Sequence, residues 1–445
     1  MKRLILSVSF LVALHSATAQ FKNIRLAELH GDIYPPSGPS ITVNRKNSNN
    51  IIAGIAPDRT IYTKDGGVTW SETKLQSPFG VSGYPTVTSD SKGDIYLFHL
   101  ADPSGKGKDD DSWLDRIICQ KSTDEGVTWK SGEPFGYTPS KDQYRAWTSA
   151  SYKKQDLYST WTQFDKYGVS DTSYHSNIMF SSSDNEGKKW SKALRINQIA
   201  GDCTNGDNTT MGAMSAVDAK GKIFVAWANR GVIYFDRSYD NARTWLQNDI
   251  IITQQQGGWE MDIPGMDHSN GLPVLMIDNS PSRYHGSLYL LWADQRNGKN
   301  NSDIWFMRSG NGGDNWTTPL CVNKDLPTGQ AGLPTAQAGE KGKHQFLPWM
   351  SVDQTTGNIY IIYYDRRNYD DLQTDVYMAY SADGGSSFTE VKISESPFVP
   401  EPNFIVEHTN IAAHKGVITP IWTRIDDGKK SVWMSVIKDT DFLKK

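Results

Sequence analysis

One eight-residue pattern constrains this chain more than any other feature of its sequence, because it recurs six times. The pattern reads approximately Ser/Thr-x-Asp/Asn-x-Gly-x-Thr-Trp, and we call it the box. Internal repetition of this kind is the signature of a repeat architecture, in which each unit buries its apolar face against its neighbours. Successive copies begin 55 to 72 residues apart, at Thr63, Ser122, Ser183, Ser238, Ser309 and Ser381.

The residue types of the box predict a hairpin turn rather than a catalytic site. Asp and Ser side chains satisfy the backbone N–H groups of a tight turn, and Gly supplies the positive φ that such a turn requires. Asn185 and Asn311 replace the Asp, Ala242 replaces the Gly, and Phe388 replaces the final Trp. We expect the boxes to share one face and their tryptophans to be buried between neighbouring sheets: Trp70, Trp129, Trp190, Trp245 and Trp316.

A second pattern surrounds every box and predicts four short strands in each repeat. A turn followed by a β-branched and aromatic run precedes each copy, as in residues 93–96 and 357–360. Another short run lies before it, and a fourth run follows the box, as in residues 318–323. Four antiparallel strands repeated radially form a propeller blade, and the chain has no sustained helical periodicity.

The number of predicted strands indicates seven blades, with six as the alternative. Six units contain a box, and three boxless strand candidates follow them at residues 408–413, 417–422 and 431–437. A lone strand candidate at residues 24–29 precedes the first unit. Pairing of this first strand with residues 431–437 would complete a seventh blade and leave no free sheet edge. The fold class is therefore all-β, with residues 20–445 forming a single propeller domain.

The N-terminus has the pattern of a signal peptide over residues 1–19. Lys2 and Arg3 precede an apolar run at residues 4–14, and Ala17-Thr18-Ala19 is a typical cleavage site. No later segment is apolar enough to cross a membrane. We therefore expect a secreted protein, periplasmic or extracellular, and a monomer. The formal net charge of −4 lacks the basic excess of a nucleic-acid-binding protein.

The sequence gives no reason to expect a cofactor or a metal ion. The three cysteines form no C-x-x-C pair, so a thiolate zinc site is not expected. Asp109, Asp110 and Asp111 lack the alternating ligand spacing of a calcium loop, and residues 202–207 are also more typical of a plain loop.

The boxes resemble the Asp-boxes of sialidases and related BNR-repeat proteins, and this resemblance covers nearly the whole mature chain. Residues 201–203, 345–349 and 364–367 are further similar to secreted bacterial BNR proteins that are labelled exo-sialidase by similarity. The resemblance implies an exo-sialidase-like glycoside hydrolase that acts on sialylated or other acidic glycans. Sialidases have six blades and an early Arg-Ile-Pro motif. This chain has no Arg-Ile-Pro and predicts seven blades.

Propeller geometry places the candidate site on the face opposite the boxes. That face carries the loops between strands 2 and 3 and the connections between blades. An aromatic residue followed by Asp or Arg recurs at the end of the second strand of several units. The start of the first strand adds Arg145, Trp147, Trp349, Glu407 and His408. We expect these positions to surround one mouth of the central channel.

Residue chemistry and the resemblance together suggest roles at this mouth. Arginines bind a carboxylate bidentately, so the predicted substrate-binding residues are Arg230, Arg296, Arg367 and Arg424, together with Trp349. The predicted catalytic residues are Asp294, Asp365, Tyr364 and Glu407. A Tyr nucleophile assisted by Glu is what the resemblance implies, because a carboxylate would be repelled by an anionic sugar.

Two other interpretations compete with hydrolysis. In the first, Asp and Arg on adjacent blades pair with each other and only hold the rim. In the second, the protein is a non-catalytic propeller that binds glycan, peptide or protein, or it is a glycosidase or lyase of another specificity. A hydrolase should show a Tyr hydroxyl next to a Glu or Asp, whereas a binding protein should show neutralised arginines.

Overall fold

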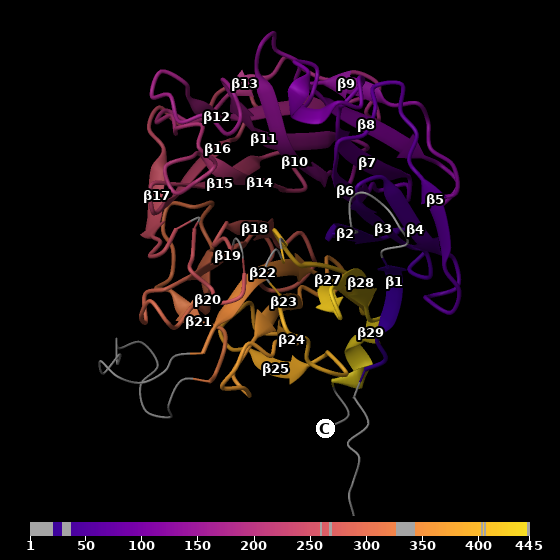
Figure 1. The fold of residues 1–445 in the computed structure, drawn as a ribbon, viewed down its shortest axis with the longest axis vertical. Helices are drawn as coiled ribbons and strands as arrows, with labels where there is room; N and C mark the ends of the chain where they lie inside the picture. The colour runs from indigo at the N-terminus through magenta and orange to yellow at the C-terminus, as the bar shows by residue number, and fades with distance from the viewer. Residues whose placement is uncertain are drawn as a thin grey trace, which may run out of the picture.

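The computed structural model describes residues 21–28, 37–258, 260–266, 269–325, 343–401, 404 and 406–442. The described chain forms seven antiparallel sheets arranged as the blades of a ring (Figure 1). Helix within these residues is confined to two 3₁₀ turns, at Gly107–Asp109 and Asp439–Asp441. The seven-bladed prediction is therefore confirmed and the six-bladed alternative is wrong. The predicted signal peptide lies outside the described residues.

The first six blades each contain four consecutive strands, with the first strand innermost. The strands of blades 1 to 3 are β2 (Ser37–Val43), β3 (Ile51–Ala56), β4 (Arg59–Thr63), β5 (Ser71–Lys74), β6 (Gly83–Ser89), β7 (Ile95–Leu100), β8 (Ile117–Ser122), β9 (Glu133–Phe135), β10 (Asp142–Ala150), β11 (Leu157–Phe164), β12 (Ser176–Ser183) and β13 (Leu194–Arg195). Those of blades 4 to 6 are β14 (Met211–Val217), β15 (Ile223–Asn229), β16 (Val232–Ser238), β17 (Ile250–Gln254), β18 (Val274–Ile277), β19 (Leu288–Asp294), β20 (Asp303–Ser309), β21 (Leu320–Cys321), β22 (Gln345–Val352), β23 (Ile359–Asp365), β24 (Asp375–Ser381) and β25 (Thr389–Lys392).

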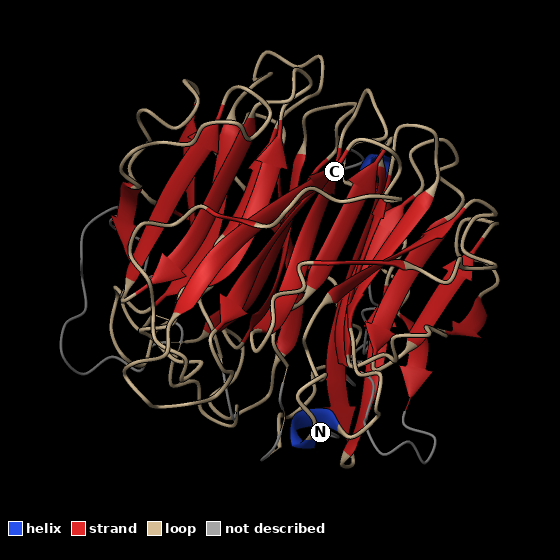
Figure 2. Cartoon of the chain, turned by 90° about the horizontal axis from the view of Figure 1, so that it is seen from above, coloured by secondary structure: helices blue, strands red, loops and turns tan. Residues whose placement is uncertain are grey.

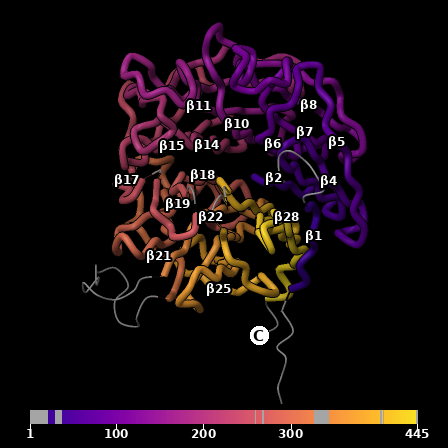
Figure 3. Tube along the Cα trace, viewed as in Figure 1, coloured from indigo at the N-terminus to yellow at the C-terminus, as the bar shows by residue number. Residues whose placement is uncertain are grey.

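Blade 7 is built from both ends of the chain. It contains β26 (Asn410–His414), β27 (Val417–Asp426) and β28 (Lys429–Met434), and β1 (Ile24–Glu28) is its outer strand. Ile24 pairs with Met434 and Glu28 pairs with Ser431 in an antiparallel register. The short β29 (Ile437–Lys438) also pairs with β27. Figure 3 shows the result, because the yellow end of the tube returns to the indigo β1 and closes the ring.

The second strand of each blade carries most of the core. β15, β19 and β23 are buried along their whole length. Both faces of such a strand are covered by neighbouring blades, so its sequence is a continuous apolar run rather than an alternating one. Figure 2 shows the strands running side by side between two layers of loops. The polar residues that end these runs are consequently delivered to one of those two layers.

All six boxes form the predicted turn between the third and fourth strands. In the first box, Gly67 N donates to Thr63 Oγ1 at 3.0 Å, and Thr69 N donates to Asp65 Oδ1 at 2.9 Å. The equivalent pair of bonds is present in the other five boxes. Asn185 and Asn311 accept the same bond as Asp, which explains why the substitution is tolerated. The boxes therefore share one face of the ring.

The box aromatics pack against the preceding blade, but the tryptophans are less buried than predicted. The Trp245 ring lies 5.2 Å from Phe180 of blade 3, and Trp316 lies 5.7 Å from Phe235 of blade 4. The five tryptophans are only half-buried, whereas Phe388 is 3% exposed. Part of each large indole therefore remains outside the contact with the neighbouring blade.

Candidate functional site

The innermost strands line a central channel whose two ends differ. A cavity of about 180 Å³ runs along these strands and reaches Trp147 and Trp349. The two indole rings are 4.4 Å apart, and the imidazole of His408 lies 5.4 Å from each of them. Two smaller cavities of about 20 and 30 Å³ lie against Arg145 and Glu407. Trp147 borders all three cavities, so the aromatic pair separates the channel from the mouth opposite the boxes.

Backbone bulges shape this mouth. The pairing register shifts near the start of the first strand in blades 1, 2, 3, 4 and 6. A residue with positive φ lies within each shift, and the five are Gly38, Tyr84, Arg145, Gly212 and Leu347. Positive φ is uncommon for residues other than glycine, and bulges next to functional sites re-aim side chains. The bulge in β10 directs neighbouring Tyr144 and Arg145 to the same carboxylate.

Glu407 is the centre of the polar cluster at the mouth. The Tyr144 hydroxyl donates to Glu407 Oε1 at 2.7 Å, and the Arg145 guanidinium forms an ion pair with the other carboxylate oxygen. Arg145 Nη2 also lies 2.8 Å from His408 Nδ1. Asn270 Nδ2 donates to the Glu407 carbonyl oxygen at 2.7 Å, which ties the cluster to the loop before β18. A phenol, a carboxylate and a guanidinium are thus held together over the channel.

Burial and charge set the protonation states of this cluster. Burial, followed by the negative charge of Glu407, raises the pKa of Tyr144 well above its usual value. The charge of Glu407 and then burial raise the pKa of Tyr84 to about 12. Burial and the charge of Arg145 lower the pKa of His408 well below its usual value, so this imidazole is neutral and accepts from Arg145. The phenols of Tyr84 and Tyr144 are therefore protonated near neutral pH.

Asp294 and Arg296, both predicted site residues, are paired with each other in blade 5. Arg296 Nε donates to Asp294 Oδ1 at 2.9 Å, and its Nη2 is 2.5 Å from Oδ2. The guanidinium also lies 4.5 Å from the centre of the Trp305 ring. Trp292 Nε1 donates to Asp294 Oδ2 at 2.9 Å. The Asp294 side chain is fully buried, and Arg296 neutralises its charge within the same blade.

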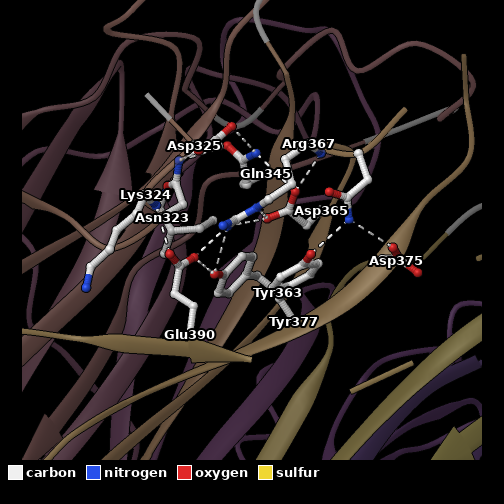
Figure 4. A network of polar contacts seen from close by, with 12 residues as sticks. Asn323, Lys324, Asp325, Gln345, Tyr363, Asp365, Arg367, Asp375, Tyr377 and Glu390 are labelled. Atoms are coloured by element: carbon white, nitrogen blue, oxygen red, sulfur yellow. Dashed lines mark hydrogen bonds and ion pairs between the residues drawn. The ribbon is translucent and has the colours of Figure 1, made fainter. Parts of the chain in front are cut away.

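Asp365 and Arg367 repeat the same arrangement in blade 6. Arg367 Nη2 lies 2.6 Å from Asp365 Oδ2 and 2.5 Å from Glu390 Oε1 (Figure 4). The Tyr363 hydroxyl also donates to Glu390. Burial lowers the pKa of Arg367, but its bonds to Glu390 and Asp365 outweigh burial and raise the pKa. Figure 4 shows this guanidinium directed at the two carboxylates of its own blade.

Arg424 and Arg230 do not join a common site either. Arg424 Nη2 is 2.5 Å from Asp426 Oδ1, and Arg424 Nε donates to Oδ2 of the same residue at 2.7 Å. Arg230 is exposed, with its own backbone at positive φ. The two cavities beside Glu407 are lined by Arg145 and by none of the four predicted arginines. The predicted convergence of these arginines is therefore not seen among the described residues.

The Tyr–Glu pair exists, but with a different tyrosine from the predicted one. Tyr364 is buried and donates to the Thr423 carbonyl oxygen at 2.5 Å, so it holds blade 6 to blade 7. Glu407 is bonded instead to Tyr144. The predicted group at the start of the first strand, which includes Trp349 and Glu407, does lie together. A recurring x-Pro or Gly-x step at this strand start, as at Tyr84-Pro85 and Leu347-Pro348, is the signal that could have indicated the bulges.

Two further properties bear on what the chain can hold. Within the described ranges, no group of three or more His, Cys, Asp or Glu side chains is arranged to bind a metal ion. In the same part of the chain, no helix has the length and apolar character needed to cross a membrane.

Proteins of known structure share this fold. No protein-family model and no curated protein matches the sequence. The solved ulvan lyase of polysaccharide lyase family PL25 is 12% identical, covers 94% of this chain and 96% of its own, and has a TM-score of 0.52. The GH93 α-L-arabinofuranosidase of Fusarium graminearum is 13% identical, with coverages of 95% and 99% and a TM-score of 0.50. A Hadza microbial sialidase is 12% identical, with coverages of 87% and 73% and a TM-score of 0.46. At these identities, the first two show a shared fold.

Proposed function

We propose that this protein is a secreted, carbohydrate-active enzyme that cleaves glycosidic bonds at the channel mouth opposite the boxes. The observation that carries the proposal is the hydrogen bond of 2.7 Å between the Tyr144 hydroxyl and the Glu407 carboxylate. The ulvan lyase and the arabinofuranosidase, which share this fold, are by name glycan-cleaving enzymes. The specific activity that we propose is that of an exo-sialidase-like glycoside hydrolase, because the boxes resemble those of sialidases.

The pair can act as an activated nucleophile. Glu407 accepts the phenolic proton while Tyr144 Oη attacks the anomeric carbon, and the bond to the leaving oxygen breaks as that oxygen takes a proton from a water molecule. The raised pKa of Tyr144 makes a base necessary, because too little phenolate forms without one. The hydroxide left from that water then cleaves the tyrosyl–sugar bond, and Glu407 returns the proton to the phenolate of Tyr144. A neutral phenol suits an anionic sugar, which would repel a carboxylate nucleophile.

Neighbouring groups prepare this pair for reaction. Arg145 pairs with the Glu407 carboxylate and holds it in a fixed orientation. Trp349 and Trp147 form an apolar floor beneath the cluster, which excludes water from one side of the sugar. Asp294, Asp365 and their arginines have a structural role in this proposal, because each pair is neutralised within its own blade.

The test is turnover of fluorogenic sialosides and of a panel of other glycosides by the wild-type protein and by Tyr144→Phe and Glu407→Gln. Loss of a general base or nucleophile typically lowers kcat by about 10²- to 10⁴-fold, and we expect losses in this range. Tyr363→Phe is a matched control, because Tyr363 also donates to a glutamate but lies in the blade 6 network. This control should keep wild-type turnover.

Two results would change the assignment. An unsaturated uronic product, detected by its ultraviolet absorbance, would identify a lyase instead of a hydrolase. Glycan-array binding without turnover of any substrate would favour the non-catalytic alternative, which the neutralised state of Arg296, Arg367 and Arg424 supports. Wild-type turnover in Glu407→Gln would show that the pair is not catalytic.

A further inference from the structure

A row of aromatic rings leads outward from Glu407 over blades 2 and 3. The Tyr84 ring lies 5.0 Å from Tyr144, edge to face, and Tyr167 stacks on Tyr144 at 5.1 Å. Trp113 continues the row at 6.1 Å from Tyr167, and its Nε1 donates to Ser82 Oγ at 2.9 Å. Tyr84, Trp113 and Tyr167 are partly exposed. They come from a strand start and from two loops between second and third strands, so they lie on the face opposite the boxes.

Arg116, at the end of the loop that carries Trp113, is the centre of a stacked platform with side chains from two blade-to-blade connections. Arg116 Nε and Nη2 donate to the two oxygens of buried Asp115 at 2.8 and 2.5 Å, which holds the guanidinium plane in place. Tyr137 lies over this guanidinium at 4.6 Å, and Phe79 lies 5.7 Å from it. Buried Leu114 anchors the loop in the core cluster of blades 2 and 3. The platform is thus preorganised rather than flexible.

The exposure of Tyr137 is the feature that the fold itself does not require. Its side chain is 55% exposed, although it lies in the connection between β9 and β10 and contacts a fixed cation. Exposed aromatic rings present a flat apolar surface with a polar hydroxyl, which suits the C–H face and the hydroxyl groups of a sugar. Arg116 has five N–H donors and Asp115 accepts from two of them, so others can donate to sugar hydroxyls.

We propose that the aromatic row and the platform of Phe79, Arg116 and Tyr137 form a binding path for a glycan chain. The chain would lie across blades 2 and 3, with the bond to be cleaved over Tyr144 and Glu407 and several sugar units on the rings. This inference rests on the proposed function for the position of the cleaved bond, and it names the substrate as an oligosaccharide or polysaccharide. A free monosaccharide would not reach from Glu407 to Tyr137 and would gain nothing from the platform.

The experiment measures binding separately from turnover. Affinity electrophoresis in gels that contain polysialic acid, ulvan or linear arabinan reports retardation of the wild-type protein and of Tyr137→Ala. We expect Tyr137→Ala to bind the retarding polysaccharide about 3- to 10-fold more weakly, which is the value of one aromatic stacking contact. Tyr137→Phe keeps the ring and should stay close to the wild type. Titration with monosaccharides should not distinguish the three proteins.

A matched control lies on the other face of the ring. Tyr239 is 50% exposed and lies 5.1 Å from the Arg237 guanidinium, but it belongs to the box of blade 4. Tyr239→Ala should bind every polysaccharide as the wild type does. Melting temperatures identify any variant that is merely destabilised.

The inference is overturned if the wild type is retarded by none of the three polysaccharides, or if Tyr137→Ala is retarded as strongly as the wild type. Failure of the proposed function gives a different result, namely polysaccharide binding that depends on Tyr137 without any turnover. Tyr144→Phe should lose turnover and retain binding, because its ring stays in the row.

Discussion

Replacing Arg367 by Ala distinguishes a structural rim from a substrate-binding rim. The substitution removes the bonds of 2.8 and 2.6 Å to Asp365 and the bond of 2.5 Å to Glu390. The Asp365 side chain is fully buried and that of Glu390 is 8% exposed. Two carboxylates would remain in a largely dry space without their shared cation. Breaking a buried pair in this way costs about 3–5 kcal/mol, so we expect a loss of unfolding free energy of that size near pH 8.

The loss should depend on pH with a definite sign. Burial raises the pKa of the Asp365 carboxyl to about 6 even though Arg367 opposes this rise, and removal of Arg367 raises it further. The folded protein then holds the proton more tightly than the unfolded chain, whose Asp has a pKa of about 3.9. The corresponding stability is present below pH 4 and is lost as the pH rises through 6 and above. Arg367→Ala should therefore be closer to the wild type at pH 5 than at pH 8.

Equilibrium urea unfolding of both proteins at pH 5 and pH 8 measures this difference. Lys299→Ala is the control, because Lys299 pairs at 3.6 Å with Asp262 and the two side chains are 77% and 73% exposed. Exposed pairs contribute about 0–1 kcal/mol, so this variant should differ little from the wild type. An equally small loss for Arg367→Ala, or a loss that is the same at both pH values, would refute the structural interpretation. Loss of glycan binding at unchanged stability would restore Arg367 as a substrate-binding residue.

Two further predictions concern burial. Phe388→Ala should lower the free energy of unfolding by about 3–5 kcal/mol and Trp245→Ala by about half as much, because Phe388 is 3% exposed whereas the larger Trp245 ring is only half-buried. Urea unfolding of both variants measures which loss is larger, and a larger loss for Trp245→Ala would contradict this prediction. Burial raises the pKa of Asp236 to about 7 and that of Asp249 to about 6, so the stability that these carboxyls contribute is present below pH 4 and is lost as the pH rises through 6 to 7. Melting temperatures at pH 5 and pH 8 should therefore differ less for Asp236→Asn than for the wild type, and an unchanged difference would show that Asp236 does not titrate in this range.

Two Asp–Arg pairs of the rim follow a local signal in the sequence, namely the spacing of their residues along the chain. Asp294 and Arg296 are two residues apart, as are Asp365 and Arg367, and side chains at this spacing lie on the same side of extended backbone. Such residues can pair with each other before they meet another blade, and the structure shows that they do. Their shared position on the face opposite the boxes does not distinguish convergence at one mouth from pairing within a blade, whereas the two-residue spacing favours pairing within a blade.

The burial of the box tryptophans is a property that the sequence of one repeat does not determine. The box pattern predicts the turn and the contact with the preceding blade, because both depend on residues within a few positions of each other. The covered fraction of an indole depends on how far one sheet extends over the next. That distance is a property of two blades, and no single repeat contains it.

The sequence by itself determined the propeller, its seven blades and its closure through both ends of the chain. These features follow from strand and turn patterns that lie within one repeat and recur, so each copy supports the others. The pairing of Tyr144 with Glu407 in the candidate site was decided by the tertiary structure. Tyr144 and Glu407 are 263 residues apart, and they meet only because closure of the ring brings blades 3 and 7 to the same channel mouth. The bulge at Arg145 then directs two neighbouring side chains to one carboxylate, which no local pattern of residue types specifies.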